Sequence, residues 1–280
     1  MAVVIAVASV GVIMAMAGSG SSRASHSSTS ASAGRAATAT APEAAAAAWV
    51  AGQVSPNTVI SCDQAMCTAL KAHGYPAKNL RPLSVETALK KSAVVVVTPA
   101  AQQLFGSSLI TAWSPSALAT FGSGASAVSI RIVAPNGAAA YKQEVQKGQS
   151  ARAASEEVLT QTKGVTASGA AARDLNSGRV DERLMEAVAD AATVEPIDIV
   201  DFGNVGTGAS ADIPLRYADL VASGSAAGMS EPAYVQALRS GMGSGAGFRP
   251  DRTQLLTLRG QQVLRVEFLA PSPFNVLNSP

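Results

Sequence analysis

An uncharged segment near the start of the chain, Ala2–Ala17, is followed by a long tract of Ser, Ala, Gly and Thr. A helix needs roughly 20 apolar residues to cross a bilayer core, with a lower limit near 17, so this Ala-rich segment is slightly short. We expect residues 1–20 to be a single-pass membrane anchor. A cleaved signal peptide and a secreted product are the alternative, because Ala15-Met16-Ala17 has the small-x-small form of a cleavage site.

The tract that follows, residues 21–41, contains almost no large apolar side chain. Such a composition cannot repay the entropy of ordering, so the segment is predicted to be a disordered linker. Arg23 and Arg35 lie after the apolar segment, and this charge bias taken alone disfavours placing the rest of the chain outside the cell. An apolar segment followed by so long a linker still favours a folded part held on the outer side of the cell membrane, and we expect that location.

The composition limits the partners of the folded part. Hydrophobic residues make up 48% of the 280 residues, which is ample for a core, and charged residues make up only 14%. The net charge of +2 is too small to indicate nucleic acid as a partner. A chain of this length suggests one or two domains.

The sequence contains two cysteines, Cys62 and Cys67. Their separation of five is wrong for a Cys-x-x-Cys redox or zinc pair. Cys62 is expected at the end of a strand and Cys67 one turn into the next helix, where their Cα atoms could approach the roughly 4.4–6.8 Å that a disulfide needs. A disulfide is therefore predicted, which agrees with export to an oxidising compartment, and two buried thiols are the alternative.

Apolar runs and helix-capping residues predict a first α/β domain over residues 42–135. Val94–Val97 is a continuous apolar run, which is typical of a strand buried on both faces. Asp63 is placed to cap a helix that Gly74 ends. The expected elements are helices over 42–50, 64–73 and 99–106, and strands over 58–60, 79–81, 94–97, 118–121 and 127–133.

A long polar helix, expected over about 137–162, occupies a connecting segment, residues 136–163. It leads to a second domain over residues 164–280, which is predicted to be α+β. The fold class predicted for the whole chain is therefore α/β with an α+β second half, built as two small sandwich-like domains. Asp181 is a natural N-cap in this part. The expected elements are helices over 168–175, 181–192 and 231–242, a strand over 197–202, an extended piece over 213–216, and a hairpin of 253–259 with 262–269.

Residues 49–133 carry a family resemblance in several segments, which are Ala-Trp49-Val, Thr-Val-Ile-Ser-Cys-Asp63, Leu70 before Gly74-Tyr75, Val94–Ala100, Ala119–Gly124 and Val128–Val133. This part resembles the extracytoplasmic C-terminal α/β domain of actinobacterial glycosyltransferase-like membrane proteins. In that family the acidic catalytic loop belongs to a polytopic membrane part that this sequence lacks. The resemblance therefore implies a location outside the membrane and work in the cell envelope, and it transfers no catalytic residue.

Few residues are candidates for catalysis. His73 is the only histidine outside the linker, and its expected place at a helix end is explained by the helix dipole. Asp201-Phe202-Gly203 matches a kinase tripeptide, but the sequence lacks the glycine-rich loop, the strand lysine and the His-Arg-Asp motif that accompany it in kinases. The glycine-rich stretch 203–211 departs from phosphate-binding patterns, so it is interpreted as a flexible connection between strands.

Glu195, Asp198 and Asp201 flank one predicted strand, where the period of two directs Glu195 and Asp198 to opposite faces. Only distances could exclude a glycosidase-type carboxylate pair. We assign no catalytic, cofactor-binding or metal-binding residue. The sequence favours a non-catalytic binding or scaffolding protein of the cell envelope, with another envelope protein or a glycan as partner. A glycan-directed envelope enzyme with a carboxylate-based site is the alternative.

Overall fold

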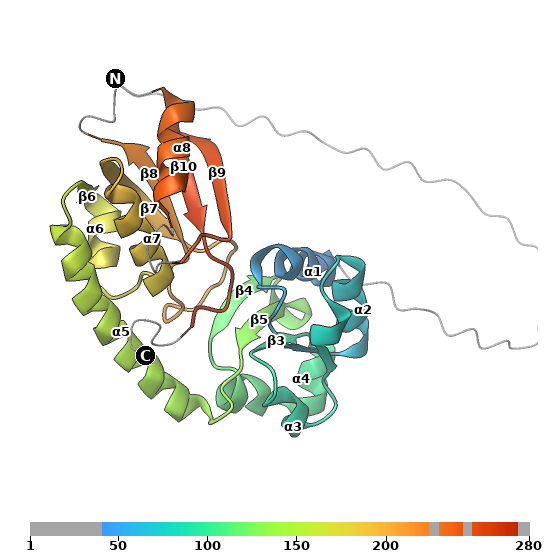
Figure 1. Cartoon of the computed structure of the whole chain (residues 1–280). Coiled ribbons are helices and arrows are strands. Elements are labelled where there is room, and N and C mark those ends of the chain that lie inside the picture. The colour runs from blue at the N-terminus through green and yellow to red at the C-terminus, as the bar shows by residue number, and fades with distance from the viewer. Residues whose placement is uncertain (1–40, 224–229, 243–247, 274–280) are drawn as a thin grey trace, which may run out of the picture. The chain divides into compact units, whose positions relative to one another are not determined.

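The structure is a computed structural model that describes residues 41–223, 230–242 and 248–273. It contains two five-stranded sheets with helices packed on them, so the fold is mixed α/β, as predicted (Figure 1). All the described residues belong to one compact unit. The predicted anchor, residues 1–20, and nearly all of the predicted linker, residues 21–41, lie outside the described residues.

The first sheet has the strand order β2-β1-β3-β5-β4. Its first three strands run parallel, and β5 is antiparallel to both of its neighbours. The central strand is buried on both faces, because Val94 and Val96 join one core and Val95 and Val97 join another, as its run of valines predicts. The main elements of this half are α1 (Ala41–Gln53), β1 (Ile60–Cys62), α2 (Gln64–Ala72), β2 (Leu80–Pro82), α3 (Glu86–Leu89), β3 (Val94–Val97), α4 (Pro99–Phe105), β4 (Ala117–Phe121) and β5 (Val128–Ile132).

Capping side chains explain where two helices of this half begin. Asp63 accepts a hydrogen bond of 2.9 Å from the backbone N–H of Met66 at the start of α2. Thr98 accepts one of 3.1 Å from the N–H of Ala101 at the start of α4. The helices and strands expected here occur in the expected order, and α3 and a π-helical turn at Leu109–Trp113 are additions that the sequence did not predict.

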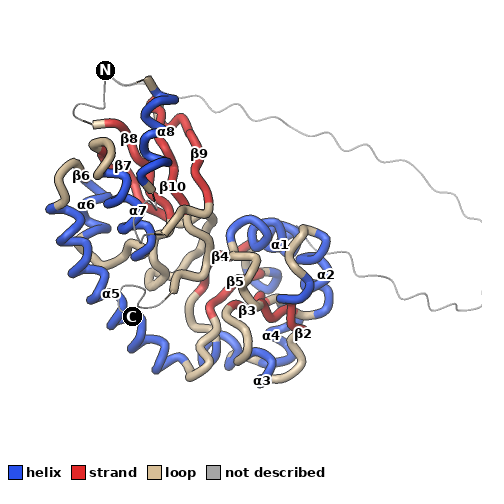
Figure 2. The backbone as a smooth tube through the Cα atoms, in the orientation of Figure 1, coloured by secondary structure: helices blue, strands red, loops and turns tan. Residues whose placement is uncertain are grey.

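The second sheet has the order β6-β7-β8-β10-β9 and is antiparallel except for the β6–β7 pair. One face of its strands packs in a common core with α6, α7 and α8. Figure 2 shows α5, which precedes them, as one uninterrupted helix. The elements are α5 (Ala138–Gln161), β6 (Val165–Ala167), α6 (Gly169–Leu175), α7 (Glu182–Ala192), β7 (Ile197–Gly203), β8 (Tyr217–Ala222), α8 (Glu231–Gly241), β9 (Arg252–Leu258) and β10 (Gln261–Glu267).

Two strands of this sheet differ from the prediction. The sequence did not predict the short strand β6, and it placed the extended piece of β8 too early, at 213–216. In the structure Leu215 makes only an isolated bridge with Val180, and the strand begins two residues later. Asp181 caps α7, as predicted, by accepting the N–H of Arg183 at 3.0 Å.

The glycine-rich connection between β7 and β8 lies along β4, the edge strand of the first sheet. The backbone N–H of Thr120 donates to the carbonyl of Thr207 at 2.8 Å, and the N–H of Ser210 donates to the carbonyl of Ala117 at 2.8 Å. Trp49 of α1 adds an indole N–H bond of 2.9 Å to the carbonyl of Val205. The stretch connects two strands, as predicted, but it is not the free loop that the sequence suggested, because these bonds hold it against the edge of the first sheet.

Candidate functional site

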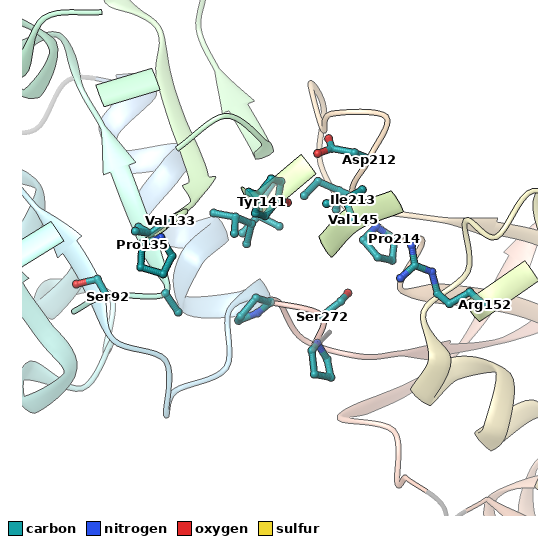
Figure 3. Close-up of a pocket in the computed structure, with 15 residues that line it drawn as sticks. Ser92, Val133, Pro135, Tyr141, Val145, Arg152, Asp212, Ile213, Pro214 and Ser272 are labelled. Carbon is teal, nitrogen blue, oxygen red and sulfur yellow. The ribbon is translucent and has the colours of Figure 1, made fainter. Parts of the chain in front are cut away.

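A cavity of about 380 Å³ opens where six stretches of the chain meet (Figure 3). They are the residues before β3, strand β4, the end of β5 with the residues after it, helix α5, the loop before β8 and the segment after β10. Small-molecule sites in proteins are typically about 300–1,000 Å³. The lining residues are Ser92, Ala93, Leu118, Ile132, Val133, Pro135, Tyr141, Val145, Arg152, Asp212, Ile213, Pro214, Pro271, Ser272 and Pro273.

Most of the lining is apolar, with aliphatic side chains and four prolines. Only Arg152 and Asp212 bring a formal charge, and Ser92, Tyr141 and Ser272 bring hydroxyl groups. An apolar wall with a few polar groups that fix orientation is the usual composition of a binding pocket for an organic molecule.

Tyr141, Ser116 and Asp212 form a hydrogen-bonded chain at one side of the cavity. The Ser116 hydroxyl donates to a carboxylate oxygen of Asp212, and it also bonds to the hydroxyl of Tyr141. Burial raises the pKa of Tyr141 to about 12, so its hydroxyl stays neutral. Asp212 is therefore held in place by a neutral partner and keeps capacity to accept further hydrogen bonds.

Arg152 and Glu156, one turn apart on α5, clamp the backbone around Gly178. Arg152 is almost fully buried, and its Nε donates to the carbonyl of Gly178 at 2.9 Å. Glu156 accepts from the N–H of Gly178 at 2.8 Å and from that of Val180 at 3.3 Å. The carboxylates of Glu182, Asp181 and Glu156 compensate the charge of Arg152. This clamp holds α5 against the second sheet's helices and fixes the arginine at the cavity wall.

A second hollow of about 370 Å³ lies next to the cavity and shares Val145 and Asp212 with it. Its wall is more polar than the cavity's wall, because α5 here exposes lysine and glutamine side chains, and we call it the polar hollow. The lining residues are Pro115, Ser116, Lys142, Val145, Gln146, Gln149 and Asp212.

Cys62 and Cys67 form a disulfide, with their Cα atoms 5.3 Å apart. Cys62 ends β1 and Cys67 lies in the first turn of α2, as the sequence predicts. Both residues are buried in the first core. The bond therefore locks a strand to the next helix, and neither cysteine lines the cavity.

The carboxylates that the sequence singled out do not converge on the cavity. Asp198 accepts a bond of 2.9 Å from Thr166 at the β6–β7 pair. Asp201 lies opposite Asp219 in the β7–β8 register, and Asp219 is fully buried with two 2.8 Å bonds from Arg265. Burial and the neighbouring Asp219 raise the pKa of Asp201.

The other motifs have structural explanations. His73 is the C-terminal cap of α2, as expected, and Asp201-Phe202-Gly203 lies within β7. Within the described ranges, no group of three or more His, Cys, Asp or Glu side chains is placed to hold a metal ion, and no helix is long and apolar enough to cross a membrane.

No sequence pattern predicted the residues that line the cavity. The one available signal was Arg152, which lies one turn after Gly148 on the long helix. A Cβ atom at Gly148 would lie 3.1 Å from Nη1 of Arg152, so this glycine makes room for the guanidinium. Comparison of the chain with protein-family models, with curated proteins and with solved structures gives no significant match.

Proposed function

We propose that this chain is a membrane-tethered, extracytoplasmic binding protein of the cell envelope, and that its folded part binds a small, largely apolar molecule without catalysing a reaction on it. The cavity carries the proposal. It has the volume of a ligand site, an apolar wall, and an arginine and an aspartate held by other parts of the protein.

The arrangement of carboxylates favours binding over the alternative, a glycan-directed enzyme. A glycosidase needs two carboxyl groups facing one bond, about 5–10 Å apart. The cavity presents one carboxylate, Asp212. The cross-strand pair of Asp201 and Asp219 lies elsewhere, and Arg265 already occupies both oxygens of Asp219.

Filling the cavity tests the binding function. Val145 lies on the cavity wall and is buried, so Val145→Phe places a ring in the space that a ligand would occupy. We expect this variant to bind the fluorescent probe N-phenyl-1-naphthylamine at least about tenfold more weakly, a loss of about 1.4 kcal/mol. Fluorescence titration of the purified full chain measures the affinity.

Val85→Phe is the matched control, because the same substitution is made at a residue 53% exposed and outside the cavity. It is expected to keep the affinity of the unchanged protein, and thermal unfolding verifies that both variants are folded. Equal binding by the two variants, or no binding by the unchanged protein, would refute the proposed function.

The location is proposed from the apolar segment and linker that precede the fold, and from the resemblance of residues 49–133 to an extracytoplasmic domain. The disulfide supports it, because such bonds persist in oxidising compartments. Alkaline phosphatase fused after Pro280 should be active, because this reporter needs an oxidising compartment. A cytosolic reporter that is active at the same position would contradict the proposal, and a mature N-terminus at Gly18 would favour the secreted form over the anchored one.

A further inference from the structure

The apolar cavity and the polar hollow are neighbours that share two wall residues, Val145 and Asp212. A molecule that extends from one into the other meets two different environments. Aliphatic side chains and prolines surround its first part. Hydrogen-bonding side chains surround its second part.

The chemistry of the polar hollow indicates the kind of group it suits. Gln146 offers an amide donor and an amide acceptor. Gln149 keeps its amide oxygen and one amide hydrogen, because its Nε2 already donates to the carbonyl of Ser177 at 2.8 Å. The Ser116 hydroxyl is already bonded to Asp212 and Tyr141. The single positive charge, Lys142, is matched by the single negative charge, Asp212. An anionic group would meet the Asp212 carboxylate, and a cationic group that cannot donate hydrogen bonds would leave the amides unused. Hydroxyl groups can both donate to Asp212 and accept from the amides.

One hydroxyl group on the wall of the apolar cavity is left without a partner. The hydroxyl oxygen of Ser272 is buried and has no hydrogen-bond partner among the described residues. Figure 3 shows Ser272 on the segment that borders the cavity, across from Ile213 and Pro214. A buried hydroxyl without a partner is costly, and a single ligand oxygen near the junction of chain and head would satisfy it.

We propose that the ligand is an amphiphile whose hydrocarbon chain fills the apolar cavity and whose uncharged, hydroxyl-rich head, such as a sugar, occupies the polar hollow. This inference rests on the proposed binding function and specifies its ligand class. Asp212 lies at the boundary of the two spaces and accepts hydrogen bonds from the head.

Three amphiphiles with the same chain and different heads test the inference. Decyl glucoside, decyl phosphate and decyltrimethylammonium are each titrated, below their micelle concentrations, into the full chain loaded with N-phenyl-1-naphthylamine. Decyl glucoside is expected to displace the probe at a concentration at least about tenfold lower than either charged amphiphile needs. Displacement by decyl phosphate or decyltrimethylammonium at an equal or lower concentration would overturn the inference.

A pair of variants on one helix locates the head group. Gln146 lines the polar hollow, whereas Gln143 is exposed on the same helix and lines neither space. Gln146→Ala should weaken decyl glucoside binding at least about threefold and leave the probe affinity unchanged, and Gln143→Ala should change neither.

The possible failures are distinguishable. If the probe binds and Val145→Phe abolishes its binding, but the glucoside shows no preference or Gln146→Ala has no effect, the inference is wrong and the binding function stands. If the probe does not bind the unchanged protein, both are wrong.

Discussion

Gly178→Ala is expected to destabilise the protein by about 2–5 kcal/mol, the sum of backbone strain and steric overlap. Gly178 has a φ of +66°, a backbone conformation that is unfavourable for residues with a Cβ atom. A Cβ atom there would also lie 2.2 Å from the backbone carbonyl oxygen of Gln149 on α5. That oxygen belongs to a helix and cannot turn aside, so α5 and the segment before α7 must separate.

The separation would also stretch the bonds from Arg152 and Glu156 to Gly178, so the cavity wall should loosen together with the fold. Urea unfolding of the purified protein measures the change in the free energy of unfolding. Gly260→Ala is the matched control, because Gly260 has a φ of +82° and no atom within 4 Å of its added Cβ. Gly260→Ala should lower the free energy of unfolding only by the backbone strain, about 1–2 kcal/mol. An equal effect of the two substitutions would show that the contact with Gln149 is unimportant.

Residue patterns predicted the first half of the fold well because its signals are local. The valine run of β3 needs both faces covered, and Asp63 and Gly74 mark the two ends of α2 within the sequence itself. The disulfide follows from the same local geometry, since a strand end and the first turn of the next helix bring Cys62 and Cys67 together.

The second half contains interactions that no local pattern reveals. β8 reads Tyr-Ala-Asp-Leu-Val-Ala, and a carboxylate in the middle of a buried strand argues against a strand. Asp219 is tolerated there because Arg265, directly opposite on β10, donates two hydrogen bonds to it. β6 has only three residues, so its pattern is too short to distinguish from a loop.

The cavity was beyond sequence reasoning for a similar reason. Its wall combines residues from Ser92 to Pro273, so its shape depends on how six stretches of the chain pack. The close packing of the glycine-rich connection between β7 and β8 was equally hidden from local patterns. Gly208 has a φ of +73°, and a Cβ there would lie 2.9 Å from Cβ of Thr120. Its glycines thus allow the connection to approach β4 closely, a role that a search for phosphate-binding patterns does not consider.

Glu156→Gln is expected to remove a large part of the pH dependence of stability. Burial raises the pKa of Glu156 from 4.5 to about 7, against the opposing effects of the Gly178 and Val180 N–H groups and of Arg152. The folded protein therefore holds this proton more tightly than the unfolded chain does. The stabilisation is fully present below pH 4.5 and is lost as the pH rises to about 7, a change of about 3 kcal/mol.

Glutamine resembles the protonated carboxyl group and cannot ionise, so the variant's free energy of unfolding should fall much less over this range than that of the unchanged protein. Urea unfolding at several pH values between about 4.5 and 7 measures the slope of the free energy of unfolding against pH. Glu157→Gln, the exposed neighbour on α5, should retain the slope of the unchanged protein. Asp201 and Glu186 also have raised pKa values and act in the same direction, so the difference between the two variants isolates Glu156. If Glu156→Gln kept the full slope, the carboxylate would be stable in its ionised form, held by the N–H groups of Gly178 and Val180.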